Sequence, residues 1–156
     1  MKKGIICLAA LFILLTIASG CASQPKNEPV DVNNAVNELK TKVPFDDQMT
    51  EISPETALTL YGLQAEQVEE IGAVLSTGAT SEEIAVIKAA DGKLETCKQA
   101  LEKRIEEQKA SFENYVPAEI PKLEHACLME KDDVVILCVA KNADTAKQVV
   151  QEILGA

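Results

Sequence analysis

Two stretches of the chain, IAVIKAADGKLETCKQAL at residues 84–101 and VILCVAKNADTAKQVVQE at residues 135–152, follow the same order of elements. Each begins with an apolar run that contains β-branched residues. Each then passes through a turn with Lys and Asp and continues with the 3- and 4-residue spacing of an amphipathic helix. The two stretches share few identical residues, but their common order indicates a fold built from two similar strand–helix units.

A second strand precedes each unit and turns it into a hairpin followed by a helix. Apolar runs at 68–75 and 83–90 form the first predicted hairpin, and strands at 126–129 and 134–140 meet across Asp132-Asp133 in the second. The last of these strands is apolar on both faces, so we expect it to be central in the sheet. Two such ββα units predict an α+β two-layer sandwich, a four-stranded antiparallel sheet with helices on one side.

Four helices complete the expected fold. N-terminal helices are predicted over 30–43 and from Pro54 to Gly62, and they would cover an edge of the sheet or extend the helical layer. The final helix is predicted over 144–154. The longest helix, 93–115, has an apolar stripe with one polar member, Gln108. The apolar positions of this stripe are Leu94, Cys97, Leu101, Ile105, Phe112 and Tyr115.

The start of the chain is typical of a lipoprotein signal peptide. The basic start Met1-Lys2-Lys3 leads into an apolar run, Ile5–Ile17, and the small residues Ala18-Ser19-Gly20 directly precede Cys21. This pattern resembles the bacterial lipobox, whose cysteine is alkylated with diacylglycerol before cleavage. The alternative, an uncut membrane helix, would need about 20 apolar residues, and the run is shorter.

This start divides the chain into a signal peptide at 1–20, a lipidated tether at 21–30 and a single α+β domain at 31–156. The full sequence has 15 Lys and Arg against 25 Asp and Glu, a formal net charge of −10. So acidic a chain argues against nucleic acid as a partner and against binding to anionic lipid headgroups, so the acyl group at Cys21 would supply the membrane attachment. Aromatic residues make up only 3% and Trp is absent, which disfavours sugar-binding and base-stacking sites.

Few residues suggest catalysis. Adjacent acidic pairs such as Glu82-Glu83 are expected to lie in solvated turns or on solvated faces, because neighbouring side chains diverge. His125 is the only histidine, and no Gly-x-Ser-x-Gly motif accompanies it, so a hydrolase is only the third-ranked function. The hydroxyl-rich stretch 76–81 lacks the spacing of a phosphate-binding loop and is interpreted as a hairpin connection.

Three thiols remain in the predicted domain: Cys97, Cys127 and Cys138. On a strand, His125, Cys127 and Met129 share one face, and a turn at Asp132-Asp133 would place Cys138 opposite Cys127. Three arrangements are open: ordinary core thiols, which we favour, a Cys127–Cys138 disulfide, or a soft-metal site formed by these four residues. We therefore expect no metal and no cofactor.

A further pattern lies in the long helix and in the two inner strands. Three features form this pattern: the strand start Glu83-Ile84-Ala85-Val86-Ile87-Lys88, the strand Val134 to Val139 and a motif in the long helix. Together they resemble a group of small bacterial lipoproteins, mostly from Gram-positive anaerobes, that carry the domain of unknown function 4358. The resemblance covers roughly residues 49–150. It implies a lipoprotein on the extracytoplasmic face of the cell membrane and brings no assigned activity. The helix motif consists of Arg104, Gln108, Phe112, Tyr115 and Pro117.

The spacing of this motif places Arg104, Gln108, Phe112 and Tyr115 on one side of a helix. We expect the two aromatic rings to pack on the sheet. Arg104 and Gln108 would bond to strand ends or to Glu119, and structural support is favoured over contact with a ligand.

The sequence thus predicts a membrane-anchored extracytoplasmic lipoprotein that acts as a non-catalytic interaction module, with an unidentified protein or cell-envelope partner. The alternative is a small-ligand or metal-binding lipoprotein that uses the Cys/His/Met hairpin.

Overall fold

The computed structural model describes residues 29–155, so the expected signal peptide, Cys21 and most of the tether lie outside the described residues. Two 3-10 turns, η1 (Ala65–Gln67) and η2 (Pro117–Glu119), lie between the longer elements. Those elements are, in chain order, α1 (Val32–Lys42), β1 (Thr50–Ile52), α2 (Pro54–Tyr61), β2 (Val68–Leu75), β3 (Glu83–Ala89), α3 (Leu94–Glu113), α4 (Ile120–Glu124), β4 (Cys127–Lys131), β5 (Val134–Val139) and α5 (Ala143–Leu154).

The strands form one antiparallel open sheet in the order β1-β2-β3-β5-β4. Both predicted hairpins are present, and β3 and β5 join them along the centre of the sheet, where Ile87 pairs with Val135. The α+β class is therefore confirmed. The expected sheet of four strands is wrong by one, because β1 pairs with β2 from Thr50↔Leu75 to Ile52↔Ala73. With only three residues and little apolar character, β1 has no alternation that a sequence pattern can reveal.

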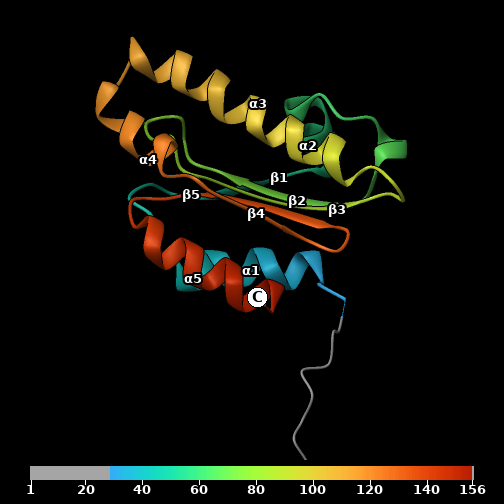
Figure 1. Cartoon of the computed structure of the whole chain (residues 1–156). Helices are drawn as coiled ribbons and strands as arrows, with labels where there is room; N and C mark the ends of the chain where they lie inside the picture. Colours follow the sequence, from blue (N-terminus) through green and yellow to red (C-terminus); the bar gives the residue numbers. More distant parts are fainter. Residues whose placement is uncertain (1–28, 156) are drawn as a thin grey trace, which may run out of the picture.

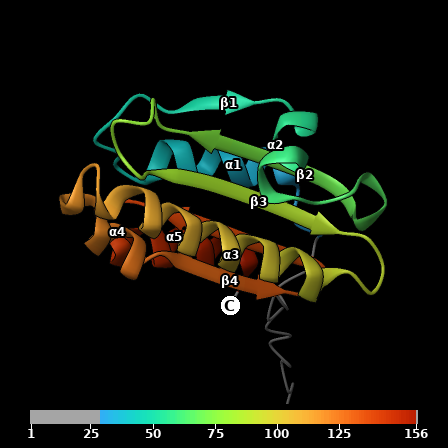
Figure 2. The same cartoon turned by 90° about the horizontal axis from the view of Figure 1, so that it is seen from above.

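Helices cover both faces of the sheet, so the expected two-layer arrangement with helices on one side is also wrong. Figure 1 shows α1 and α5 below the sheet and α2, α3 and α4 above it. Figure 2, seen from above, shows α3 between β3 and β4 and running in nearly the same direction as these strands. The cause lies in the central strands. All six residues of β5 are buried, and six of the seven in β3, which requires an apolar layer against each face.

Alternate residues of the central strands point to opposite faces of the sheet and pack into two separate hydrophobic cores. Ile84, Val86 and Ile136 pack with the apolar faces of α1 and α5. Ala85, Ile87 and the other inner residues of the opposite face pack with α2, α3 and α4. The second core contains the aromatic side chains of Tyr61 and Phe112, whereas the buried members of the first are aliphatic residues and cysteines.

Local sequence signals set the helix ends as predicted. The Ser53 side chain accepts a hydrogen bond from the Thr56 amide at the start of α2, and Gly62 ends the helix in the left-handed region with φ 66°. Gly72 has a different role. A Cβ atom there would lie 2.8 Å from Cγ2 of Val36, so the absence of a side chain lets α1 lie directly against β2.

The two ends of the sheet differ in what lies beside them. Pro29 and Val30, the first described residues, lie next to the β4–β5 turn and the end of α5, and Lys131 Nζ donates to the Leu154 carbonyl oxygen at 2.7 Å. The opposite end holds the start of β3 and the end of β5, since Glu83 pairs with Val139 and Lys88 with Val134. Five residues of strand separate these ends by about 17 Å.

Within residues 29–155, no helix has both the length and the apolar character that crossing a membrane requires.

Candidate functional site

Three buried glutamates gather at the end of the sheet where β3 begins. Glu82 and Glu83 are each 1% exposed and Glu119 is 8% exposed. Glu82 is the last residue of the connection between β2 and β3, Glu83 is the first residue of β3, and Glu119 lies in the short turn η2 after α3. Buried carboxylates are rare unless they are paired, so the hydrogen-bond partners of this cluster decide what it can do.

Glu83 is held by side chains from two helices. Arg104 of α3 donates from Nε and Nη2 to Oε2 of Glu83 at 3.0 and 2.8 Å, and Gln108 donates to the same oxygen at 3.3 Å. The Tyr61 hydroxyl of α2 donates to Oε1 at 3.0 Å. Burial, followed by the charge of Glu83, raises the pKa of Tyr61 well above its usual value, so the phenol stays a donor.

Glu82 is held mainly by the backbone of the segment that follows α1. The amide of Asp46 donates to both carboxylate oxygens at 3.0 and 2.9 Å, and the Asp47 amide donates to Oε2 at 3.0 Å. The Thr80 hydroxyl and Lys122 Nζ, each at 3.2 Å, complete the set. Every oxygen of this carboxylate therefore has a donor.

Lys122 of α4 connects the cluster. Its Nζ lies 3.2 Å from a carboxylate oxygen of Glu82, of Glu119 and of Asp46. Burial alone would lower the pKa of Lys122, but the hydrogen bonds to Glu119, Asp46 and Glu82 raise it, so the amine is charged. Glu119 also accepts from the amide and the hydroxyl of Ser81, at 2.8 and 3.1 Å.

A pocket of about 380 Å³ opens beside this cluster, between the β2–β3 connection and the last turns of α3. Phe112 is buried in its wall, whereas Tyr115 is 68% exposed and is the exposed large hydrophobic residue of the described chain. The two rings lie 6.0 Å apart between centroids, with an interplanar angle of 52°. The pocket is lined by Leu75, Ser76, Thr77, Gly78, Thr80, Glu82, Glu83, Arg104, Gln108, Ser111, Phe112 and Tyr115.

The arrangement suits binding better than proton transfer. A general acid or base needs an oxygen within reach of a substrate, and the oxygens of Glu82 and Glu83 are bonded to protein donors. The same bonds fix the side chains that form the floor of the pocket. The cluster can therefore hold a rigid polar surface in place, which is the requirement for recognising a small ligand.

The predicted helix motif lies in this site. Arg104, Gln108, Phe112 and Tyr115 all line the pocket. Of the two partners considered for Arg104 and Gln108, the strand end is the one found, in Glu83 at the start of β3. The expectation that both rings pack on the sheet is wrong for Tyr115, because α3 ends at Glu113 and the ring lies beyond the helix.

The cysteine hairpin lies elsewhere, on the β4–β5 edge of the sheet. Cys127 pairs directly with Cys138, as a turn at Asp132-Asp133 predicts, and both are free thiols with buried side chains. Burial raises the pKa of Cys138 to about 12 and also raises that of Cys127, which disfavours the thiolate that binds metals. Cys97, also a free thiol, is buried in α3.

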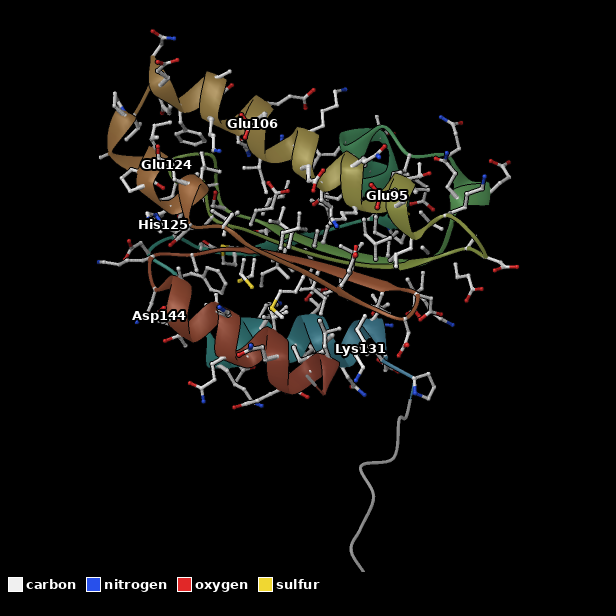
Figure 3. The ribbon with its side chains drawn as sticks, viewed as in Figure 1. Glu95, Glu106, Glu124, His125, Lys131 and Asp144 are labelled. Carbon is white, nitrogen blue, oxygen red and sulfur yellow. The ribbon has the colours of Figure 1, made fainter. Side chains whose placement is uncertain are left out.

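His125 lies just before β4. Its Nδ1 is 2.8 Å from the Pro121 carbonyl oxygen. Figure 3 shows His125 at the same end of the molecule as Asp144, which lies in the first turn of α5, while Lys131 lies at the far end of β4. Met129 is half-buried against the core formed with α1 and α5. Across residues 29–155, no three His, Cys, Asp or Glu side chains are grouped so that they could hold a metal ion.

Sequence reasoning missed the buried cluster. Glu82-Glu83 was expected to be solvated, and this is wrong because both side chains are buried and accept hydrogen bonds from α2, α3, α4 and the segment after α1. One signal was available. Arg104 and Gln108 stand one turn apart on the side of the helix that also carries Phe112, and such a polar pair facing a sheet needs a buried acceptor.

Comparison with known proteins adds one match. The model of the family described as Domain of unknown function (DUF4358) matches residues 41–140, a range that runs from the end of α1 to just past β5 and includes the whole pocket. No curated protein and no solved structure matches the chain. Because the match spans more than half of the sequence, the chain belongs to the family of the domain of unknown function DUF4358.

Proposed function

We propose that the chain is a lipid-anchored lipoprotein of the extracytoplasmic face of the cell membrane and that its domain is a non-catalytic interaction module. The observation that carries the proposal is the order of residues 1–21: two lysines, an apolar run, Ala-Ser-Gly and then Cys21. Diacylglycerol on this cysteine supplies two acyl chains, and two chains hold a protein stably at a membrane where one does not.

The charge of the domain supports attachment through the lipid alone. The whole sequence has a net charge of −10, and removal of the signal peptide takes away Lys2 and Lys3. The anionic lipid surface would repel such a domain. A domain that stands off the membrane on a short tether has its folded surface free for a partner.

The placement of the pocket supports the interaction role. Pro29, where the described chain begins, lies beside the β4–β5 turn, and the pocket lies at the other end of β3. A tether that enters at one end leaves the opposite end facing away from the anchor. The carboxylate oxygens of Glu82 and Glu83 at that end already accept hydrogen bonds from the protein, which favours recognition of a partner over catalysis.

Replacement of Cys21 by Ser tests the anchor. The Cys21→Ser variant should lose incorporation of labelled palmitate and move from the membrane fraction to the soluble or secreted fraction. Its domain should unfold at the same urea concentration as the parent. Cys7→Ser is the matched control, because Cys7 lies within the apolar run and should be removed with it. Membrane retention of Cys21→Ser together with unchanged labelling would overturn the proposal.

A further inference from the structure

The pocket beside Glu83 offers polar groups that the protein itself leaves unpaired. Among the hydrogen bonds within residues 29–155, Nη1 of Arg104, Oε1 of Gln108 and the hydroxyl of Ser111 have no protein partner. The bonds from Arg104 and Gln108 to Glu83 fix both side chains in position. The pocket wall therefore presents a fixed donor, a fixed acceptor and a hydroxyl group that can serve as either.

Each carboxylate that lines the pocket already has a cationic partner within the protein. Glu83 is paired with Arg104 at 2.8 Å, and Glu82 is paired with Lys122 at 3.2 Å. An anionic ligand would meet no free cation in this wall and would approach a chain of net charge −10. A cationic ligand would find both carboxylates already satisfied. The electrostatics favour an uncharged ligand with many hydrogen-bonding groups.

The scarce aromatic side chains concentrate here. The described chain has four aromatic residues, and three of them, Tyr61, Phe112 and Tyr115, lie at Glu83 or in the pocket. Tyr115 lies at the rim and is 68% exposed. The negative face of such a ring attracts the weakly positive C–H groups on the flat face of a pyranose ring. The low aromatic content of the sequence argues against sugar sites, but recognition needs only one ring in the right place.

The size of the pocket is consistent with a small ligand. A volume of about 380 Å³ lies at the lower end of the range of about 300–1,000 Å³ that small-molecule sites occupy. The hydroxyl-rich connection Ser76–Thr80 closes one side, and the end of α3 closes the other. A compact site of this kind fits one or two rings better than an extended peptide, which needs a longer groove or a free strand edge.

We propose that this pocket binds a neutral saccharide, with Tyr115 stacking on the sugar face and with Arg104, Gln108 and Ser111 bonding to its hydroxyl groups. The inference rests on the proposed non-catalytic binding role but not on the lipid anchor. Its failure is therefore distinguishable from that of the anchor, which fractionation of Cys21→Ser measures separately.

A charge series of sugars tests the proposal. The full chain is extracted in a phosphocholine detergent, because a glycoside detergent would compete for the pocket, and is titrated by NMR with N-acetylglucosamine, glucosamine and glucuronate. N,N′-diacetylchitobiose and alanyl-alanine complete the panel. We expect binding of the neutral sugars, the disaccharide more tightly, and weaker or no binding of the charged ones. Preference for glucuronate, glucosamine or the dipeptide, or no binding of any neutral sugar, overturns the proposal.

Variants at the rim locate the site. Tyr115→Ala should weaken binding of the disaccharide about tenfold, or about 1.4 kcal/mol, since the variant loses the aromatic anchor. Tyr115→Phe is the matched control and should keep the affinity, because the ring is retained. Ser111→Ala should give a smaller loss. Unchanged affinity in Tyr115→Ala, with the fold intact by circular dichroism, would show that the sugar binds elsewhere.

Sedimentation with purified cell-wall glycan separates two sources of the same chemistry. Co-sedimentation that Tyr115→Ala abolishes identifies a polymeric envelope saccharide. Binding of soluble sugars without co-sedimentation identifies a free saccharide as the ligand. Equal co-sedimentation of the parent and of Tyr115→Ala counts against the pocket as the binding site.

Discussion

Glu82 and Glu83 are neighbours in the chain, are equally buried and carry the same charge, but the protein neutralises them in different ways. Glu83 receives its hydrogen bonds from the side chains of Arg104, Gln108 and Tyr61, which come from α3 and α2. Glu82 receives most of its bonds from backbone amides of the segment after α1. The first arrangement fastens two helices to the sheet through groups that a single substitution removes. The second fastens a loop through groups that most substitutions leave in place.

Loss of Arg104 should therefore have the largest effect. Arg104→Met leaves the Glu83 carboxylate buried without its cation, which typically costs about 3–5 kcal/mol of the free energy of unfolding. Urea unfolding followed by circular dichroism measures the change. Addition of Glu83→Gln to the same chain should recover part of the loss, because no uncompensated charge is then buried. A loss below about 1 kcal/mol in the single variant would contradict the structural role of the pair.

Loss of Lys122 should cost less, although this lysine contacts three carboxylates. In Lys122→Met, Glu82 keeps the amides of Asp46 and Asp47, and Glu119 keeps the amide and the hydroxyl of Ser81. We expect a decrease of about 1–2 kcal/mol in the free energy of unfolding, typical for groups that lose one of several bonds. The same urea experiment measures it. A decrease as large as that of Arg104→Met would show that the amides do not compensate the charge of Glu82.

The fold was largely predictable because its main signals are local. Hydrophobic periodicity gave both hairpins and the long helices, and Ser53, Gly62 and Asp132-Asp133 marked ends and a turn where the structure has them. The layer arrangement was not predicted, although the reason was visible in Val134–Val139. A strand that is apolar at every position implies cover on both faces, and the two N-terminal helices were available to divide between them.

The candidate site was only half predictable. Arg104, Gln108, Phe112 and Tyr115 stood out by their spacing, and all four line the pocket. Their acceptor did not stand out, because a glutamate in an acidic chain resembles a surface residue until the tertiary structure buries it. The contact between Arg104 and Glu83 joins residues 21 apart, and the contact of Glu82 with the Asp46 amide joins residues 36 apart. No periodicity within one element reveals such a pairing.

The contacts of the loop that holds Glu82 also predict that the stability of the folded protein depends slightly on pH. Hydrogen bonds from Lys122 and Lys141 lower the pKa of Asp46, and a bond from the Thr77 hydroxyl lowers that of Asp47. A carboxyl whose pKa is lower in the folded state stabilises the protein above its unfolded pKa of about 3.9, and this contribution is lost as the pH falls through the folded value. Acid should therefore loosen the loop that holds Glu82.

Asp47→Asn tests this directly, because the amide keeps the shape of the side chain but does not titrate. At pH 7 the melting temperature should fall slightly, since the neutral amide is a weaker acceptor for Thr77. Between pH 4 and pH 2 the melting temperature of the variant should fall less steeply than that of the parent. Asp91→Asn is the matched control, since the exposed Asp91 lies in the turn between β3 and α3, at the opposite end of β3 from this loop. Equal slopes in the parent and in Asp47→Asn would mean that protonation of Asp47 does not loosen the loop.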